Sequence, residues 1–339
     1  MSEKATWETG LFKIKKPTIP PISSTPAFDY VIDIYSDKVV VTDAYGNTTQ
    51  LSTISDLNNW LKNITGKKIR INANVEVTAD VTLTSNEYWI FGNTLKYLWL
   101  LSKVTLYAHA PIGWLVNCDP SKLSDFDRQQ EYFDACREDI SDSIIDIDYG
   151  FYINIAGSET TLNNIFIHAD NVAYGSFENL NGASIVVRGS DIDVYTATVK
   201  LLIVEAVDEL WFGDITALDR AVVVMISHGY TDIGSIDLSR ANVGRLRLSL
   251  TVMGGITLPA SGTVDYDLDV LTRTSNIILP SGVNALVEIE GIQIGRAIAV
   301  SVQGITAVYD PSTNKLTITS NLGTSQNAYV KARVIAPYA

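Results

Sequence analysis

A short phrase recurs through the second half of the chain: Gly213-Asp-Ile-Thr216, Gly234-Ser-Ile-Asp-Leu238, Gly255-Ile-Thr-Leu-Pro259 and Asn276-Ile-Ile-Leu-Pro280. Its isoleucines are spaced by 21, 20 and 21 residues, at Ile215, Ile236, Ile256 and Ile277. A fixed period of ~20 in a segment rich in Val, Ile and Leu is typical of a solenoid whose coils are built of strands. The sequence therefore predicts an array of stacked coils that is most regular over residues 201–291.

The composition agrees with an all-β protein. Hydrophobic residues make up 46% of the 339, and many of them are β-branched. The net charge of −13 makes nucleic acid a poor partner, because an acidic surface repels phosphates. We expect no membrane span, since no apolar run approaches ~18 residues, and no signal peptide, because the first residues are polar. Two cysteines and three scattered histidines do not form a zinc set.

Residues 1–27 are expected to form an extended arm, because Pro17, Pro20, Pro21 and Pro26 exclude helix and sheet interiors. Two interpretations remain open for this arm. It is either a tail without a binding role or a segment that docks on a partner. The docking reading depends on side chains that a purely solvated tail seldom carries, and on nearby lysines. The residues chosen as partner contacts are Trp7, Phe12, Lys15 and Lys16.

Residues 28–66 predict a β-hairpin followed by a capping helix. Strands are expected at 30–35 and 38–42, with a turn at 44–47. The helix is expected over Ser55–Ile64, capped by Ser55 and stopped by Gly66. Its apolar side would then cover the first coil of the array.

The segments that follow carry a resemblance. They are Gly66-Lys-Lys-Ile-Arg-Ile-Asn72, Val75-Glu-Val77, Val81-Thr-Leu-Thr-Ser-Asn86 and Ile90-Phe-Gly92. After a hairpin and a short helix, they resemble the first turns of right-handed parallel β-helices of the pectate-lyase-like superfamily, and most of all its archaeal and archaeal-virus branch. The resemblance implies a single-stranded right-handed parallel β-helix, which we place at residues 67–296. The superfamily holds lyases, hydrolases and structural proteins, so the resemblance says little about activity.

Two further pieces interrupt or end the solenoid. Residues 117–143 predict an acidic insertion with a helix over 124–139, flanked by Cys118 and Cys136, which are either bridged or free thiols. Residues 297–339 predict three antiparallel strands that form a cap or an oligomerisation region. Four rings before the insertion either pack against the protein or offer a platform for sugars: Tyr97, Trp99, Tyr107 and Trp114.

The sharpest polar pattern pairs two segments one coil apart. Parallel stacking would place Arg245 beside Asp265 and Arg247 beside Asp267, as an ionic ladder that fixes the register of the coils. The alternative is catalytic and uses Asp267, Asp269 and Arg247, with Ca²⁺ in a lyase or as an acid/base pair in a hydrolase. Outside that alternative we expect no cofactor. Two other alternating pairs are interpreted as solubilising side chains: Asp146 with Asp148, and Asp191 with Asp193.

The resemblance favours a non-enzymatic structural or attachment protein of a virus particle or surface appendage, such as a spike, a turret or a capsid-associated protein. Such a protein would be assembled in the cytoplasm. It would contact other virion or surface proteins through residues 1–27 and form a homo-oligomer, with a trimer favoured. A host-surface glycan is a further candidate partner. The alternatives are a polysaccharide lyase or glycoside hydrolase acting on acidic glycans, and a cell-surface adhesin.

Overall fold

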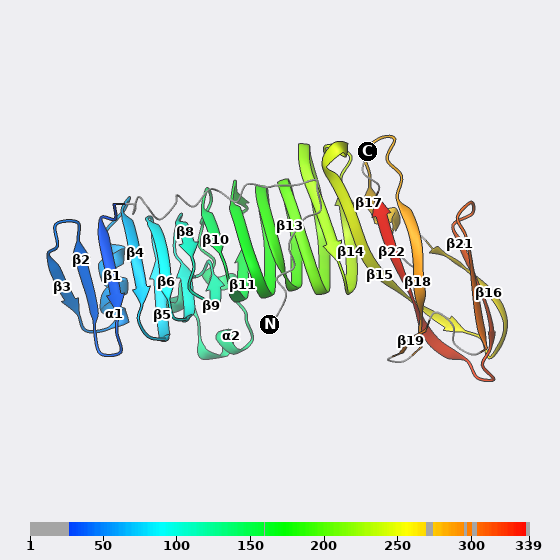
Figure 1. The fold of residues 1–339 in the computed structure, drawn as a ribbon, viewed down its shortest axis with the longest axis horizontal. Coiled ribbons are helices and arrows are strands. Elements are labelled where there is room, and N and C mark those ends of the chain that lie inside the picture. The colour runs from blue at the N-terminus through cyan, green and yellow to red at the C-terminus, as the bar shows by residue number, and fades with distance from the viewer. Residues whose placement is uncertain (1–26, 159, 269–273, 295–296, 300–303, 337–339) are drawn as a thin grey trace, which may run out of the picture.

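The computed structural model describes residues 27–158, 160–268, 274–294, 297–299 and 304–336. The proposed arm contacts Trp7, Phe12, Lys15 and Lys16, and also Asp269, lie outside the described residues. The described residues are mostly β-structure, in one 19-stranded and one 3-stranded sheet. The molecule is elongated, with β3 (Thr48–Leu51) at one end and β16 (Ser261–Asp267) and β21 (Lys315–Asn321) at the other (Figure 1).

The first end is a meander of antiparallel strands with one helix beside it. The strands are β1 (Tyr30–Ile34), β2 (Val39–Asp43) and β3 (Thr48–Leu51), and the helix is α1 (Ile54–Lys62). Leu57 and Leu61 of α1 are fully buried, which confirms the predicted apolar side. The predicted cap is wrong: Thr53, not Ser55, is the N-cap, and its hydroxyl accepts a hydrogen bond from the Asp56 amide at 3.1 Å.

The middle of the chain pairs strands in parallel. One series joins the strands β1, β4 (Lys68–Ala73), β6 (Glu87–Gly92), β8 (Thr105–Ala108), β10 (Ile144–Ile147) and the start of β13 (Phe166–Ser227). In register, Ile71 lies beside Ile90, Ile90 beside Ala108, and Ala108 beside Ile147. All four are buried, because alternate residues of a strand point to the same side.

A second series of parallel pairs runs alongside the first. Its strands are β5 (Val77–Leu83), β7 (Leu95–Leu100), β9 (Ile112–Val116), β11 (Gly150–Ala156) and a later part of β13. A short strand, β12 (Leu162–Asn163), pairs with Leu180 and Asn181 of β13. One continuous hydrophobic cluster extends from Ile32 to Ala336, so the two series share a core.

The recurring phrase keeps its predicted spacing only in part. Ile215 of β13 lies beside Ile236 of β14 (Tyr230–Asp237), as a coil of 21 residues requires. Ile236 then pairs with Ile277 of β17 (Ile277–Ile278), whereas Ile256 pairs with Ala328 in an antiparallel strand. The prediction of an unbroken parallel array to residue 291 is therefore wrong at the third phrase.

The departure occurs on β15 (Leu246–Leu258), which follows the turn η3 (Val243–Arg245). The first residues of β15 pair in parallel with β13, and then β22 (Gln326–Ala336) runs antiparallel to it from Leu248 to Leu258. β22 also pairs with β18 (Leu286–Ile294), which in turn pairs with β19 (Ala297–Ala299). The antiparallel cap thus begins near residue 248 rather than at 297.

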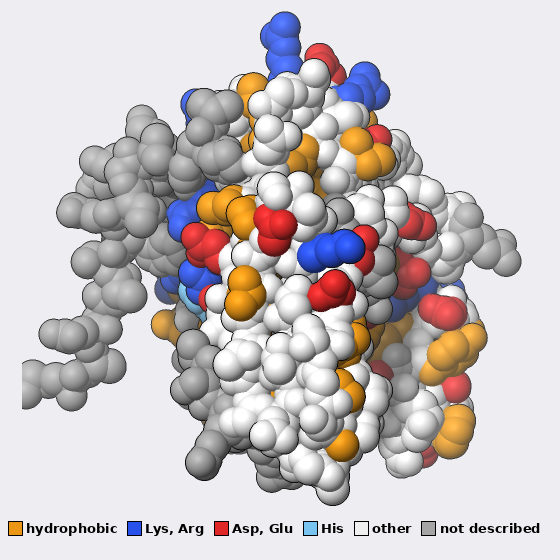
Figure 2. Space-filling model, turned by 90° about the vertical axis from the view of Figure 1, so that its right-hand side faces the viewer, with side chains coloured by type: hydrophobic (Ala, Val, Ile, Leu, Met, Phe, Trp, Pro, Cys, Tyr) orange, Lys and Arg blue, Asp and Glu red, His pale blue; other side chains and the backbone are white. Residues whose placement is uncertain are grey.

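The far end is the smaller sheet. It holds β16 (Ser261–Asp267), β21 (Lys315–Asn321) and β20 (Ile305–Asp310), in the order β16, β21, β20. The predicted turn between the last two is present, and Asn314 has a positive φ of 53° there. Figure 2 views this end of the molecule, where hydrophobic side chains form separate spots among polar ones. The exposed large apolar residues of the cap are Ile278, Leu286, Val308 and Tyr329.

Candidate functional site

A line of aromatic side chains crosses the second parallel series. Tyr97, Trp114, Tyr152 and Tyr174 are in register on four neighbouring strands. Their ring centroids are 5.9, 4.8 and 5.1 Å apart, and the last two rings are stacked. Neighbouring parallel strands lie ~4.8 Å apart, so rings at the same register position must contact one another.

The insertion lies over one end of this line. Phe133, which is 1% exposed, packs edge-on against Trp99 and Trp114 and lies 6.3 Å from Tyr152. With Val116 and the two cysteines these rings form a separate hydrophobic cluster. The insertion is therefore packed on the protein rather than projecting from it.

The predicted helix over 124–139 is wrong in extent. The segment contains η1 (Pro120–Lys122), α2 (Asp125–Gln129) and η2 (Asp134–Cys136). Ser124 caps α2 as expected, by accepting from the Asp127 amide at 3.1 Å. The helix ends after five residues, and Glu131 then adopts a positive φ of 55°. This reversal turns Phe133 toward the strands, which a continuous helix would not do.

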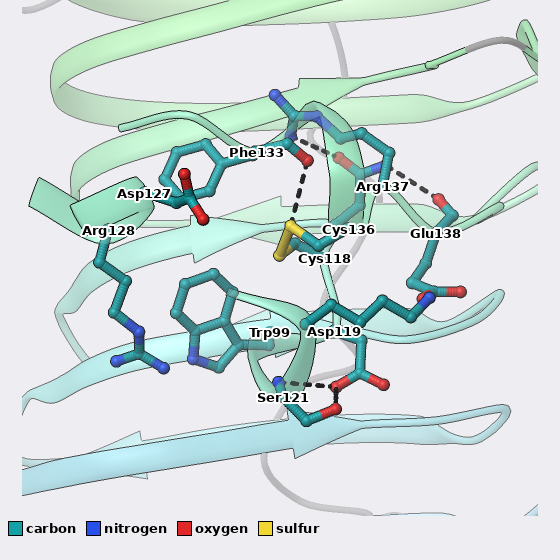
Figure 3. Close-up of a disulfide and its surroundings, with 12 residues drawn as sticks. Trp99, Cys118, Asp119, Ser121, Asp127, Arg128, Phe133, Cys136, Arg137 and Glu138 are labelled. Carbon is teal, nitrogen blue, oxygen red and sulfur yellow. Dashed lines mark hydrogen bonds and ion pairs between the residues drawn. A yellow bond between two sulfur atoms is a disulfide. The ribbon is translucent and has the colours of Figure 1, made fainter. Parts of the chain in front are cut away.

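The two cysteines, whose state the sequence left open, form a disulfide, Cys118–Cys136. Both cysteines are fully buried. The bond lies between the rings of Phe133 and Trp99 on one side and Asp119 on the other (Figure 3). The backbone amide of Asp119 also donates to the Cys136 carbonyl at 3.0 Å. The base of the insertion is thus joined by a covalent bond and by the backbone.

Two arginines of the insertion bind the strands beneath it. Arg128 donates to both carboxylate oxygens of Asp80, at 2.7 and 3.2 Å, and its guanidinium lies 5.2 Å from the Trp99 ring centroid. Arg137 donates to Asn117 and Asn154. Burial lowers the pKa of the Arg137 guanidinium from its ordinary value.

These contacts settle part of the aromatic prediction. Trp99 is 1% exposed, so it packs in the protein and offers no surface to a sugar. Tyr97 and Trp114 are partly buried in the same cluster. Tyr107 belongs to the other series of strands, where its ring lies 4.4 Å from that of Trp89.

Beyond the insertion, the aromatic line is followed by a partly exposed group of tyrosines and aspartates around Tyr174, Asp193 and Tyr195. The Tyr174 hydroxyl donates to Asp193 at 2.7 Å. Burial, and then repulsion from Glu209 and Asp191, raise the pKa of the Asp193 carboxyl despite that hydrogen bond. Burial, and then the negative charges of Asp193, Glu178 and Glu209, raise the pKa of Tyr195 to about 12. Asp193 was predicted to be a solubilising side chain, but it is half-buried and accepts the hydrogen bond from Tyr174.

A second polar group occupies the outer side of β8, β10 and β13. We call it the His–Asp face and define it as His109, Asp146, Asp148, His168 and Asp170. The His109 Nδ1 lies 2.9 Å from Asp148, and the His168 Nδ1 lies 2.7 Å from Asp146. The His168 Nε2 is 3.8 Å from Asp170. Both close pairs join neighbouring strands, and the 22-residue spacing of Asp146 and His168 was the signal for one of them.

The strand pairing around Arg245, Arg247, Asp265 and Asp267 differs from the predicted one. Arg245 ends η3, and Arg247 lies beside Val224 of β13. Asp265 and Asp267 lie on β16, opposite Thr317 and Lys315 of β21. The two segments are therefore not paired with each other as parallel strands, and the backbone register from which the pattern was predicted is wrong. The cause is β22, which occupies the edge of β15 where the next coil was expected.

Within the part of the chain that the structure describes, no three His, Cys, Asp or Glu side chains lie close enough together to hold a metal ion. Among the helices of the described residues, none has the length and apolar character to cross a bilayer. Comparison with protein-family models, with curated proteins and with solved structures finds no match to this chain.

Proposed function

We propose that the two parallel series are sides of one right-handed parallel β-helix. The support is the offset between paired strands. Residues in register are 19 apart from Ile71 to Ile90 and 21 apart from Ile215 to Ile236, and both series bury their inward side chains in one cluster. Each coil then supplies one strand to each series, as a solenoid of ~20-residue repeats requires.

On this basis the protein is a non-enzymatic structural or attachment protein of a virus particle or surface appendage. The observation that carries the proposal is the use of the outer polar and aromatic groups. They bond neighbouring strands to one another, as in His109–Asp148, His168–Asp146 and Tyr174–Asp193. Side chains committed in this way stabilise a long, persistent scaffold. The virus particle is proposed because residues 28–92 resemble the archaeal and archaeal-virus branch of the pectate-lyase-like β-helices.

The test of location is a purified particle or appendage preparation from the source of the protein. We expect the chain to be present at fixed stoichiometry and to be labelled on the outside by an antibody. A chain lacking residues 1–27 should fold but no longer associate, because the arm is the proposed contact with other virion or surface proteins. Unchanged association of this truncated chain would contradict the docking role of the arm.

The oligomeric state is tested by measuring the mass of the protein in solution. The proposal expects a homo-oligomer, with a trimer favoured. A monomer at all concentrations would remove that part of the proposal and leave the scaffold role standing.

The enzymatic alternative has its own measurement. Incubation with acidic polysaccharides, with and without Ca²⁺, should release no new chain ends. Release that is lost in Asp267→Ala or Arg247→Ala would instead assign a lyase or hydrolase. A cell-surface adhesin would be indicated by binding to a host-surface glycan without cleavage and without a particle.

A further inference from the structure

The His–Asp face is a polar surface whose members contact one another across neighbouring strands. Three carboxylates and two imidazoles lie on adjacent strands, and the Asp146, Asp148 and Asp170 side chains are 6%, 28% and 41% exposed. Burial, then the negative charges of Glu87 and Asp146, raise the pKa of the nearby Tyr107 hydroxyl. The face carries three carboxylates and no lysine or arginine among its five members.

The chain enters this side of the molecule from its N-terminal segment. The Asp29 amide donates to the Lys68 carbonyl on β4 at 2.8 Å. The Phe28 ring reaches further, to 6.4 Å from Trp89 on β6, and Trp89 in turn lies 4.4 Å from Tyr107 on β8. The rings of Phe28, Trp89 and Tyr107 therefore form a row that leads across β6 and β8 toward the His–Asp face.

The segment that precedes Phe28 has the complementary charge. Residues 1–26 hold four lysines and two glutamates, which leaves 21 basic and 36 acidic residues in the rest of the chain. Three of those lysines are close together, at Lys13, Lys15 and Lys16, next to the aromatic Phe12. A basic segment tethered to an acidic body has charge complementarity with its most acidic surfaces.

The length also fits. From β4 to β13 there are four strand spacings, or ~19 Å at ~4.8 Å each. Eleven residues separate Lys16 from Ala27, and a proline-rich segment of that length spans up to ~34 Å at ~3.1 Å per residue. The lysines can therefore reach every aspartate of the His–Asp face without leaving the surface.

We propose that the His–Asp face binds residues 1–26 of the same chain, with Lys13, Lys15 and Lys16 facing Asp148 and Asp170. A tether supplies an effective concentration in the millimolar range, so individually weak surface ion pairs are sufficient. The arm is then held against the parallel strands that carry the His–Asp face, and a partner in the particle must displace it. The inference concerns the isolated protein, so it stands or fails independently of the particle proposal.

The first experiment is zero-length carbodiimide cross-linking of the full chain, followed by proteolysis and mass spectrometry. We expect Lys13, Lys15 or Lys16 joined to Asp148 or Asp170 within a monomer. Cross-links to other surfaces only, cross-links found only in a dimer, or no cross-link from these lysines would each overturn the proposal.

The second experiment measures tryptic cleavage after Lys13 and Lys15 in the folded chain. Asp148→Asn with Asp170→Asn should speed cleavage about fivefold at low salt, and high salt should erase the difference by screening. The matched control is Asp37→Asn with Asp219→Asn, which makes the same charge change at exposed positions elsewhere.

Asp170→Asn alone serves as a check on folding, because this side chain is the most exposed of the three aspartates. It should give a smaller acceleration with an unchanged thermal transition. Equal cleavage rates in the face variants, the control and the parent chain would show that the arm does not bind there.

Discussion

At the scale of single residues, Phe133 determines how the insertion sits. It is the one ring of the insertion that reaches the aromatic line, and it is fully packed against Trp99, Trp114 and Tyr152. Phe126, seven residues earlier in the same insertion, is 68% exposed. The sequence shows two similar phenylalanines there, and only the chain reversal at Glu131 separates a buried anchor from a solvated ring.

Phe133→Ala should lower the free energy of unfolding by ~3–5 kcal/mol, because it removes a buried aromatic ring and leaves a cavity. Chemical denaturation followed by tryptophan fluorescence measures the change, since two of its partners are tryptophans. Phe126→Ala is the control, and its effect should stay within ~0.5 kcal/mol. Equal effects of the two substitutions would mean that the insertion does not pack as described.

Asp193 is expected to make stability depend on pH. Its pKa is raised in the folded state, so the folded chain holds this proton more tightly than the unfolded chain. The resulting penalty is fully present above the raised pKa and disappears as the pH falls below the unfolded value of ~3.9. Asp193→Asn keeps an acceptor for the Tyr174 hydroxyl and removes the charge.

The variant should therefore raise the thermal transition at pH ~7 and have little effect at pH ~3.5, where the parent carboxyl is protonated in both states. Parallel thermal melts of parent and variant at the two pH values measure this difference. A gain of equal size at both would point to packing instead of charge.

At the scale of elements, sequence signals that act over a few residues predicted the local structure correctly. The hairpin, α1 and the β20–β21 turn were predicted because caps, turns and periodic apolar residues act over a few positions. The helix over 124–139 failed because good helix-forming residues there are overridden by packing of Phe133 and by the disulfide. No local signal shows that Cys118 and Cys136 face each other.

The N-cap of α1 can be tested by substitution. Thr53→Ala should cost ~1 kcal/mol of stability, because it removes the acceptor of the Asp56 amide and the partner of the Asp56 carboxylate. Ser55→Ala, at the position that the sequence favoured, should change stability by less than ~0.5 kcal/mol. Denaturant midpoints of the two variants decide between the two caps, and a larger loss for Ser55→Ala would reverse the assignment.

At the scale of the whole molecule, the period of the repeat predicted some strand pairings correctly and others wrongly. It correctly placed Ile215 beside Ile236, which are paired on neighbouring parallel strands. It could not show that Ile256 would pair with Ala328, because the same alternation suits a parallel and an antiparallel neighbour equally. The strand pairing predicted for the arginine–aspartate pattern is wrong for the same reason, because β22 pairs with β15 where a further parallel strand was expected.

Removal of β22 should therefore affect the whole protein. A chain ending at Ser325 leaves β15 and β18 without their shared neighbour and exposes the apolar side that Val330 and Val334 cover. We expect self-association, because an uncovered, apolar strand edge recruits other chains. Light scattering after gel filtration measures it, with Tyr329→Ala, a 44% exposed position on the same strand, as the control. A monodisperse truncated chain would show that β22 is not needed to close the array.

The disulfide has a mechanical consequence. It joins residues only 18 apart, so it closes a small loop and does not link distant strands. If the molecule were stretched between its ends, it would lengthen as neighbouring strands separate from one another. The loop between Cys118 and Cys136 would contribute almost no length. A force-extension curve should therefore fall short of the full contour of the chain by about the length of that loop, and reduction of the bond should restore it.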